Sequence, residues 1–194
     1  MRRRTFDLIL SSVGAMLTLV LVVAGGLLMW GYSFANGNVR DQLVAQQIYF
    51  PPAGSDALKS PEIGPYLNQY AGQQLTTGAQ AEAYADHFIA VHLKEVAGGQ
   101  TYAQVSSKAQ ADPTNTQLQG QVATLFKGET LRGMLLNAYA FWKLGQIALY
   151  AAIASFALAV AMAALTVLGW RHLRHVPADA EVFTTNNARE PVTA

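Results

Sequence analysis

The side chains that could bind a metal ion are close together near the middle of the chain. His87 and His92 are five residues apart, and the carboxylates of Glu82, Asp86 and Glu95 are near them. Two histidines that share a metal on one helix are normally four residues apart. A spacing of five turns the imidazoles roughly 140° apart, at about 100° per residue. We therefore expect no metal site, with His92 partly buried and hydrogen-bonded and His87 solvated. A site of His92 with Asp86 or Glu95 is the alternative.

Nucleophilic chemistry has weaker candidates. Ser106 and Ser107 precede Lys108, but a serine–lysine pair needs more than adjacency in sequence. The chain has no Gly-x-Ser-x-Gly motif. It also has no cysteine, which excludes thiol catalysis, disulfides and cysteine metal sites. We predict no catalytic residues, no cofactor and no enzymatic activity.

Aromatic side chains are numerous between the two apolar segments described below, and two interpretations of them stay open. They could form the core of a small domain, because aromatic rings dominate its buried area. Alternatively, some of them line a pocket for a lipid, a quinone or another apolar ligand beside the membrane. The candidates for that lining are Tyr66, Tyr70, Tyr84 and Phe88.

These residues must be positioned by a chain that is 52% hydrophobic and only 13% charged. Two segments, 8–32 and 144–170, contain no charged residue. Each exceeds the roughly 20 apolar residues that a helix needs to cross a bilayer, where backbone groups must bond one another. The sequence thus predicts an all-α membrane protein: a two-helix transmembrane hairpin with a small, mainly helical extracytoplasmic domain.

Positive charge flanks both segments on the side that we predict to be cytoplasmic. Arg2, Arg3 and Arg4 precede the first, and Arg171 and Arg174 follow the second. Short arginine-rich flanks stay in the cytoplasm. We expect a multi-pass protein of the cell membrane, with both termini in the cytoplasm.

The N-terminus has a second interpretation. The stretch from Arg3 to Leu8 resembles a twin-arginine export signal, and Ser33-Phe34-Ala35 resembles a cleavage site. The apolar segment is nearly twice the typical signal length of about 7–15 residues, so we predict an uncleaved anchor.

The chain then divides into five predicted parts. They are a cytoplasmic N-terminus (1–7), transmembrane helix 1 (8–32), an extracytoplasmic helical domain (33–143), transmembrane helix 2 (144–170) and a disordered cytoplasmic tail (171–194). The net charge is +1, and residues 34–142 hold six Lys and Arg against eight Asp and Glu. No nucleic-acid partner is expected.

Within the outer domain the periodicity predicts helices. Residues 33–47 should continue the first span, with Val39, Leu43 and Gln47 on one face. Residues 51–65 should form a loop, and residues 66–70 one helical turn. Residues 101–108 should form a short helix or turn.

Two longer helices are also predicted. A capping box at Thr77 and Gln80 should start a helix that runs to about residue 96 and ends at Gly98-Gly99. Its buried face would be Ala81, Tyr84, Ala85, Phe88 and His92. Another helix should begin at Asp112-Pro113 and run into the second span.

Both spans are rich in small residues, which allow helix backbones to approach closely in lipid. The residues that we expect at such contacts are Gly14, Gly25, Gly26, Ala154, Ala157 and Ala161. No ionisable side chain lies in mid-membrane, so a transporter or channel acting alone is not expected.

Several stretches carry a resemblance. The sequences QQIYFP from Gln46, AGQQLTTGAQAEAYADHFIAVHL from Ala71, TYAQV from Thr101 and LRGMLLNAYAFW from Leu131 resemble a group of actinobacterial two-span membrane proteins of unknown function. Some members are loosely labelled aromatic ring-opening dioxygenases. The resemblance implies the two-span architecture, and the label implies a non-haem iron site of two histidines and a carboxylate.

The sequence favours a non-enzymatic membrane protein that self-associates or is an accessory or structural subunit of a bacterial envelope complex. Its expected partners are membrane lipids and itself or other membrane proteins. The alternative is an extracytoplasmic binding or sensing module for a lipid or other apolar ligand. A metal-dependent enzyme ranks third.

Overall fold

The computed structural model describes residues 2–177 and 180–182. Helices make up 79% of the chain, and these residues form no strand beyond two isolated bridges. The prediction of an all-helical chain is therefore confirmed. The disordered tail predicted over 171–194 is helical to Leu173, and residues 183–194 lie outside the described part.

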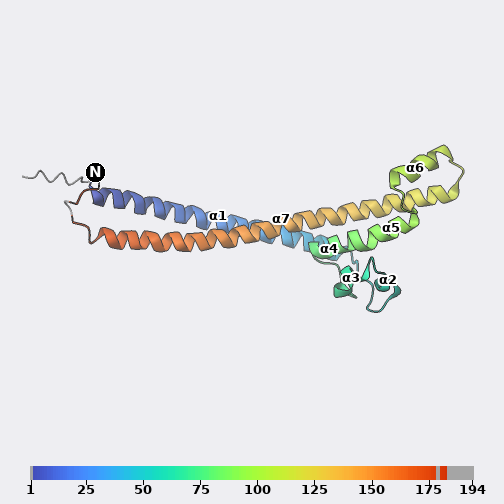
Figure 1. Cartoon of the computed structure of the whole chain (residues 1–194), viewed down its shortest axis with the longest axis horizontal. Coiled ribbons are helices and arrows are strands. Elements are labelled where there is room, and N and C mark those ends of the chain that lie inside the picture. Colours follow the sequence, from blue (N-terminus) through green and yellow to red (C-terminus); the bar gives the residue numbers. More distant parts are fainter. Residues whose placement is uncertain (1, 178–179, 183–194) are drawn as a thin grey trace, which may run out of the picture. The chain divides into compact units, whose positions relative to one another are not determined.

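Two helices are long and apolar enough to cross a membrane: α1, Arg3–Ala45, and α7, Thr116–Leu173. Between them lie shorter elements (Figure 1). In chain order these are α2 (Asp56–Lys59), α3 (Gly64–Leu67), the 3₁₀-helix η1 (Asn68–Tyr70), α4 (Gly78–Tyr84), the π-helix η2 (Ala85–Ile89), α5 (Ala90–Val96) and α6 (Tyr102–Ala111).

The chain forms two compact units, and α1 and α7 each contribute to both. The terminal unit contains the described residues of 1–29 and 149–194, and the central unit contains residues 30–148.

In the terminal unit α1 and α7 lie side by side and antiparallel (Figure 1). A Cβ on Gly14 would lie 2.6 Å from the Thr166 hydroxyl, and one on Gly169 would lie 2.6 Å from the Ser11 hydroxyl. The Ser155 hydroxyl donates a hydrogen bond to the Leu21 carbonyl at 2.9 Å. Small side chains therefore let the two backbones approach closely.

Together with the half-buried Thr18, Leu21 and Met162, the buried positions of this helix pair recur every three or four residues. On α7 they include Ala152, Ser155, Ala159 and Thr166, and on α1 Ser11, Gly14 and Gly25. This repeat is the one that keeps a contact face aligned between two paired helices.

The central unit has an apolar core. Its four largest fully buried side chains are Leu67, Leu75, Val105 and Leu125. Val39 and Leu43 of α1 are also buried, as predicted. Gln47 is not on that face, because α1 ends at Ala45 and Gln47 has a positive φ of 52° in the following turn.

The predicted helix over 77–96 is confirmed, including its ends. Thr77 and Gln80 form the capping box. After Val96, the Gly99 N–H donates to the Lys94 carbonyl at 2.8 Å, and both Gly98 and Gly99 have positive φ. Glycine tolerates that conformation at a helix end.

The predicted buried face of this helix is confirmed at Ala81 and Ala85, and Tyr84 and Phe88 are half-buried against the core. The buried residues are Ala81, Ala85, Ile89, Leu93 and Ala97, each four after the last. A spacing of four drifts around a regular helix of 3.6 residues per turn, but the wider π-helical turn offsets that drift. His92, predicted on this face, is exposed.

Three other helix predictions concern the rest of the central unit. The segment predicted as a loop over 51–65 contains α2, while α3 and η1 provide the expected helical turn near residues 66–70.

The helix start predicted at Asp112-Pro113 is wrong. The Asn115 side chain accepts a hydrogen bond from the Leu118 N–H at 3.1 Å, so Asn115 caps α7 and Pro113 lies in the preceding turn. From there α7 runs without a break to Leu173, as predicted.

Gly78, the first residue of α4, should be irreplaceable, because a Cβ there would collide with the Cβ and ring of Trp142. Gly78→Ala should destabilise the central unit by about 1–3 kcal/mol through overpacking. Hydrogen exchange of the α4 amides and thermal unfolding of the full chain measure this effect.

The matched control is Gly120→Ala in α7, where a Cβ would meet nothing within 4 Å. It should stabilise the helix by up to about 1 kcal/mol. Equal stability of the two variants would contradict the proposed contact.

Candidate functional site

The two histidines do not share a site. The His87 ring stacks on Tyr66 with centroids 3.5 Å apart and planes 2° apart, and it is half-buried. His92 is exposed, and its Nδ1 lies 2.7 Å from the Phe88 carbonyl oxygen. The expected burial is thus reversed, because His87 lies in the π-helical turn and reaches Tyr66. Among the described residues, no three His, Asp or Glu side chains form a group that could hold a metal.

The neighbouring carboxylates contact α7. Asp86 accepts a hydrogen bond from Arg132 at 2.8 Å, and Glu129 lies 3.5 Å from the same guanidinium. Asp86 holds the pKa of Arg132 above its ordinary value, mainly through this hydrogen bond. The neighbouring Glu82 carboxylate raises the pKa of Tyr139. These polar groups link α4 and η2 to α7, which is a structural role.

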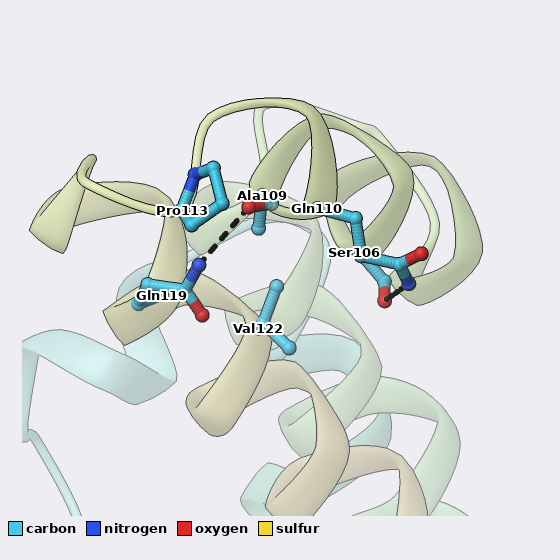
Figure 2. Close-up of a pocket in the computed structure, with 6 residues that line it drawn as sticks. All are labelled: Ser106, Ala109, Gln110, Pro113, Gln119 and Val122. Atoms are coloured by element: carbon cyan, nitrogen blue, oxygen red, sulfur yellow. Dashed lines mark hydrogen bonds between the residues drawn. The ribbon is translucent and has the colours of Figure 1, made fainter.

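The serines near Lys108 are also engaged elsewhere. The Gln110 amide donates to the Ser106 hydroxyl at 3.2 Å, and Lys108 donates to the Gln100 side chain at 2.8 Å. Figure 2 shows Ser106 at the edge of a shallow hollow of about 330 Å³ between α6 and the start of α7. In this hollow the Gln119 amide donates to the Ala109 carbonyl. The arrangement positions no base for a nucleophile.

The four aromatic residues predicted to line an apolar pocket contact other side chains of the central unit. Tyr70 and Tyr84 lie against the buried ring of Phe50, with centroids 5.2 and 5.4 Å away. Phe88 lies 4.7 Å from Tyr84, and Tyr66 is the partner of His87. Burial raises the pKa of Tyr84. Tyr70, Tyr84 and Phe88 pack against the apolar core.

A larger apolar hollow lies elsewhere, in a groove between the end of α1 and α7, with a volume of about 630 Å³. Its apolar lining includes Phe34, Val39, Leu43, Leu131, Met134, Leu135 and Phe141. Four carboxamides also line it: Asn38, Gln42, Gln46 and Asn137. We refer to it as the α1/α7 groove.

Sequence reasoning did not find the α1/α7 groove. Val39 and Leu43 were predicted on one face of the first helix, and Leu131, Met134 and Leu135 follow an apolar helical spacing farther along the chain. Because stripes usually face the core, nothing in the pattern showed that part of them stays exposed.

The predicted helix-packing residues divide into two groups. Gly14 and Gly25 are buried where α1 meets α7. Gly26, Ala154, Ala157 and Ala161 are exposed, so the contact between α1 and α7 does not use them.

The chain matches no protein-family model, no curated protein and no solved structure. The resemblance to actinobacterial two-span proteins therefore stays a prediction, and function has to be argued from the arrangement of the residues.

Adjacent glycines provide a test of the α1–α7 contact. A Cβ on Gly25 would lie 2.8 Å from the Phe156 ring, whereas one on Gly26 would meet nothing within 4 Å. Gly25→Leu should therefore weaken the helix pair by about 1–3 kcal/mol, measured by unfolding in mixed micelles of increasing SDS content.

Gly26→Leu is the control, because it adds the same atoms one residue away on the exposed side. It should leave the unfolding midpoint unchanged. If both variants shift the midpoint equally, the contact does not discriminate between the glycines and our assignment is wrong.

Proposed function

We propose that the protein is a two-span, non-enzymatic membrane protein that self-associates or acts as an accessory or structural subunit of an envelope complex. The membrane part of the proposal is supported by exposure. In the most apolar stretches of α1 and α7, only 17% and 22% of residues are buried. A core helix of a soluble protein would be mostly buried, so these faces need a lipid or protein cover.

The association part is carried by one observation, the exposed row of alanines on α7. Ala154, Ala157 and Ala161 recur at intervals of three and four, away from the buried Ser155 and Ala159. Large exposed side chains flank the row, among them Ile153, Leu158, Val160 and Leu165. Such a row lets another helix approach closely in lipid.

The topology follows from the charges. With both termini in the cytoplasm, residues 33–143 lie outside. The chain has no cysteine, so single-cysteine variants can be labelled without a background. Ala53→Cys, in an exposed turn, should react with an impermeant thiol reagent on intact cells. Thr184→Cys should react only after permeabilisation.

Two controls test that the labelling is specific and that the cells are intact. The cysteine-free parent should give no signal, and an intracellular marker protein should stay unlabelled in intact cells. Labelling of both cysteines from the same side would overturn the two-span arrangement.

Leucine at Ala157 or Ala161 tests association. Each substitution fills the alanine row while keeping the span apolar, so insertion should persist. Overpacking of a helix contact costs about 1–3 kcal/mol, which corresponds to about a 5- to 150-fold weaker association at 1.4 kcal/mol per factor of ten. Native mass spectrometry from a mild detergent measures it.

Val160→Ala is the control, because Val160 is 71% exposed and lies roughly 90° around the helix from the row, at about 100° per residue. This variant should assemble like the parent. An unchanged assembly in both leucine variants would show that the alanine row faces lipid only.

A second candidate function is the binding of an apolar ligand by the outer part of the chain. The α1/α7 groove favours this function, and it replaces the predicted aromatic lining of Tyr66, Tyr70, Tyr84 and Phe88 as its site.

A further inference from the structure

We infer that the α1/α7 groove binds a membrane lipid whose head group is uncharged and forms hydrogen bonds. The inference deepens the second candidate function and rests on the proposed membrane spans. Four features of the groove support a lipid, rather than a helix of a partner protein, as its ligand.

The first feature is its apolar surface. Val39, Leu43 and Leu135 are buried beneath it. Its walls carry Phe34, Met134 and Phe141, whose side chains are 62%, 67% and 56% exposed. Large apolar side chains left open around a concave surface mark a binding site for an apolar partner.

The second feature is its polar lining. Asn38 and Gln42 are four residues apart on α1, Gln46 lies in the turn after it, and Asn137 adds a carboxamide from α7. The Gln42 amide donates a hydrogen bond to the Asn38 side-chain carbonyl oxygen, and a carboxamide has further donor and acceptor capacity that a head group can use. No Asp, Glu, Lys or Arg lines the groove. A phosphate would favour arginine or lysine, so the amides fit the hydroxyl, ester or amide groups of an uncharged head.

The third feature is its size. The volume of about 630 Å³ is in the range of about 300–1,000 Å³ for small-molecule sites. A flexible lipid chain can follow a groove of this size.

The fourth feature is its position in the chain. Phe34 follows the first predicted span by two residues, and Phe141 precedes the second by three. On the proposed topology, the groove begins where both helices leave the outer leaflet. A lipid of that leaflet can then place a chain in it without crossing water.

The experiment uses the full chain in phosphatidylcholine vesicles that contain a small fraction of a photoreactive lipid. One probe is a photoreactive diacylglycerol, which is uncharged. The other is phosphatidylglycerol with the same photoreactive chain, which is anionic. Labelled peptides are mapped by mass spectrometry, and labelling of the two spans serves as the internal reference.

We expect diacylglycerol to label peptides of residues 34–48 and 131–141, relative to the spans, at least fivefold more than phosphatidylglycerol does. Met134→Asp places a carboxylate at an exposed position of the groove and should reduce this labelling at least fivefold. Gln110→Glu, at an exposed position of α6, adds the same charge outside the groove and should change nothing.

Four results would overturn the inference. Labelling of the spans without the groove rejects the groove and leaves the membrane proposal intact, whereas no labelling of either rejects both. A preference for phosphatidylglycerol rejects the uncharged head group. Protein cross-links from a photoreactive residue at position 134, in place of lipid labelling, would show that a protein segment occupies the groove.

Discussion

The close approach of α1 to α7 is the contact on which the rest of the structure depends. Buried and half-buried positions together recur every three or four residues along the 58-residue helix α7. In the terminal unit they are small, such as Ala152 and Ala159, and the backbones come together. In the central unit they are larger, such as Leu125 and Leu135, and they pack against the shorter helices. One helix thereby serves two packing modes.

Glycine permits close packing at a few positions in the central unit. Gly78 meets Trp142, and a side chain on Gly128 would collide with Leu93. These contacts bring α4 and α5 against α7, where Arg132 pairs with Asp86. Asp86, one of the carboxylates that suggested metal chemistry, is used in that packing.

The surfaces left free have different chemistry in the two units. In the terminal unit the free surface is apolar, with an alanine row that suits another helix. In the central unit it is the α1/α7 groove, which combines apolar side chains with carboxamides. The first surface can make a helix contact in lipid, and the second can accept a chain with a polar end. A membrane protein can use both at once.

The sequence by itself determined the helices and many of their ends. Apolar segments, the capping box at Thr77 and the stop at Gly98-Gly99 act over a few residues, so they are readable locally. Tertiary structure decided which face each helix buries. The π-helical turn moved His87 onto Tyr66, and an alanine-dense span offers several equivalent faces until its partner helix selects one. The groove exists only because α1 and α7, about 90 residues apart in sequence at this point, lie together, a long-range contact that no local pattern encodes.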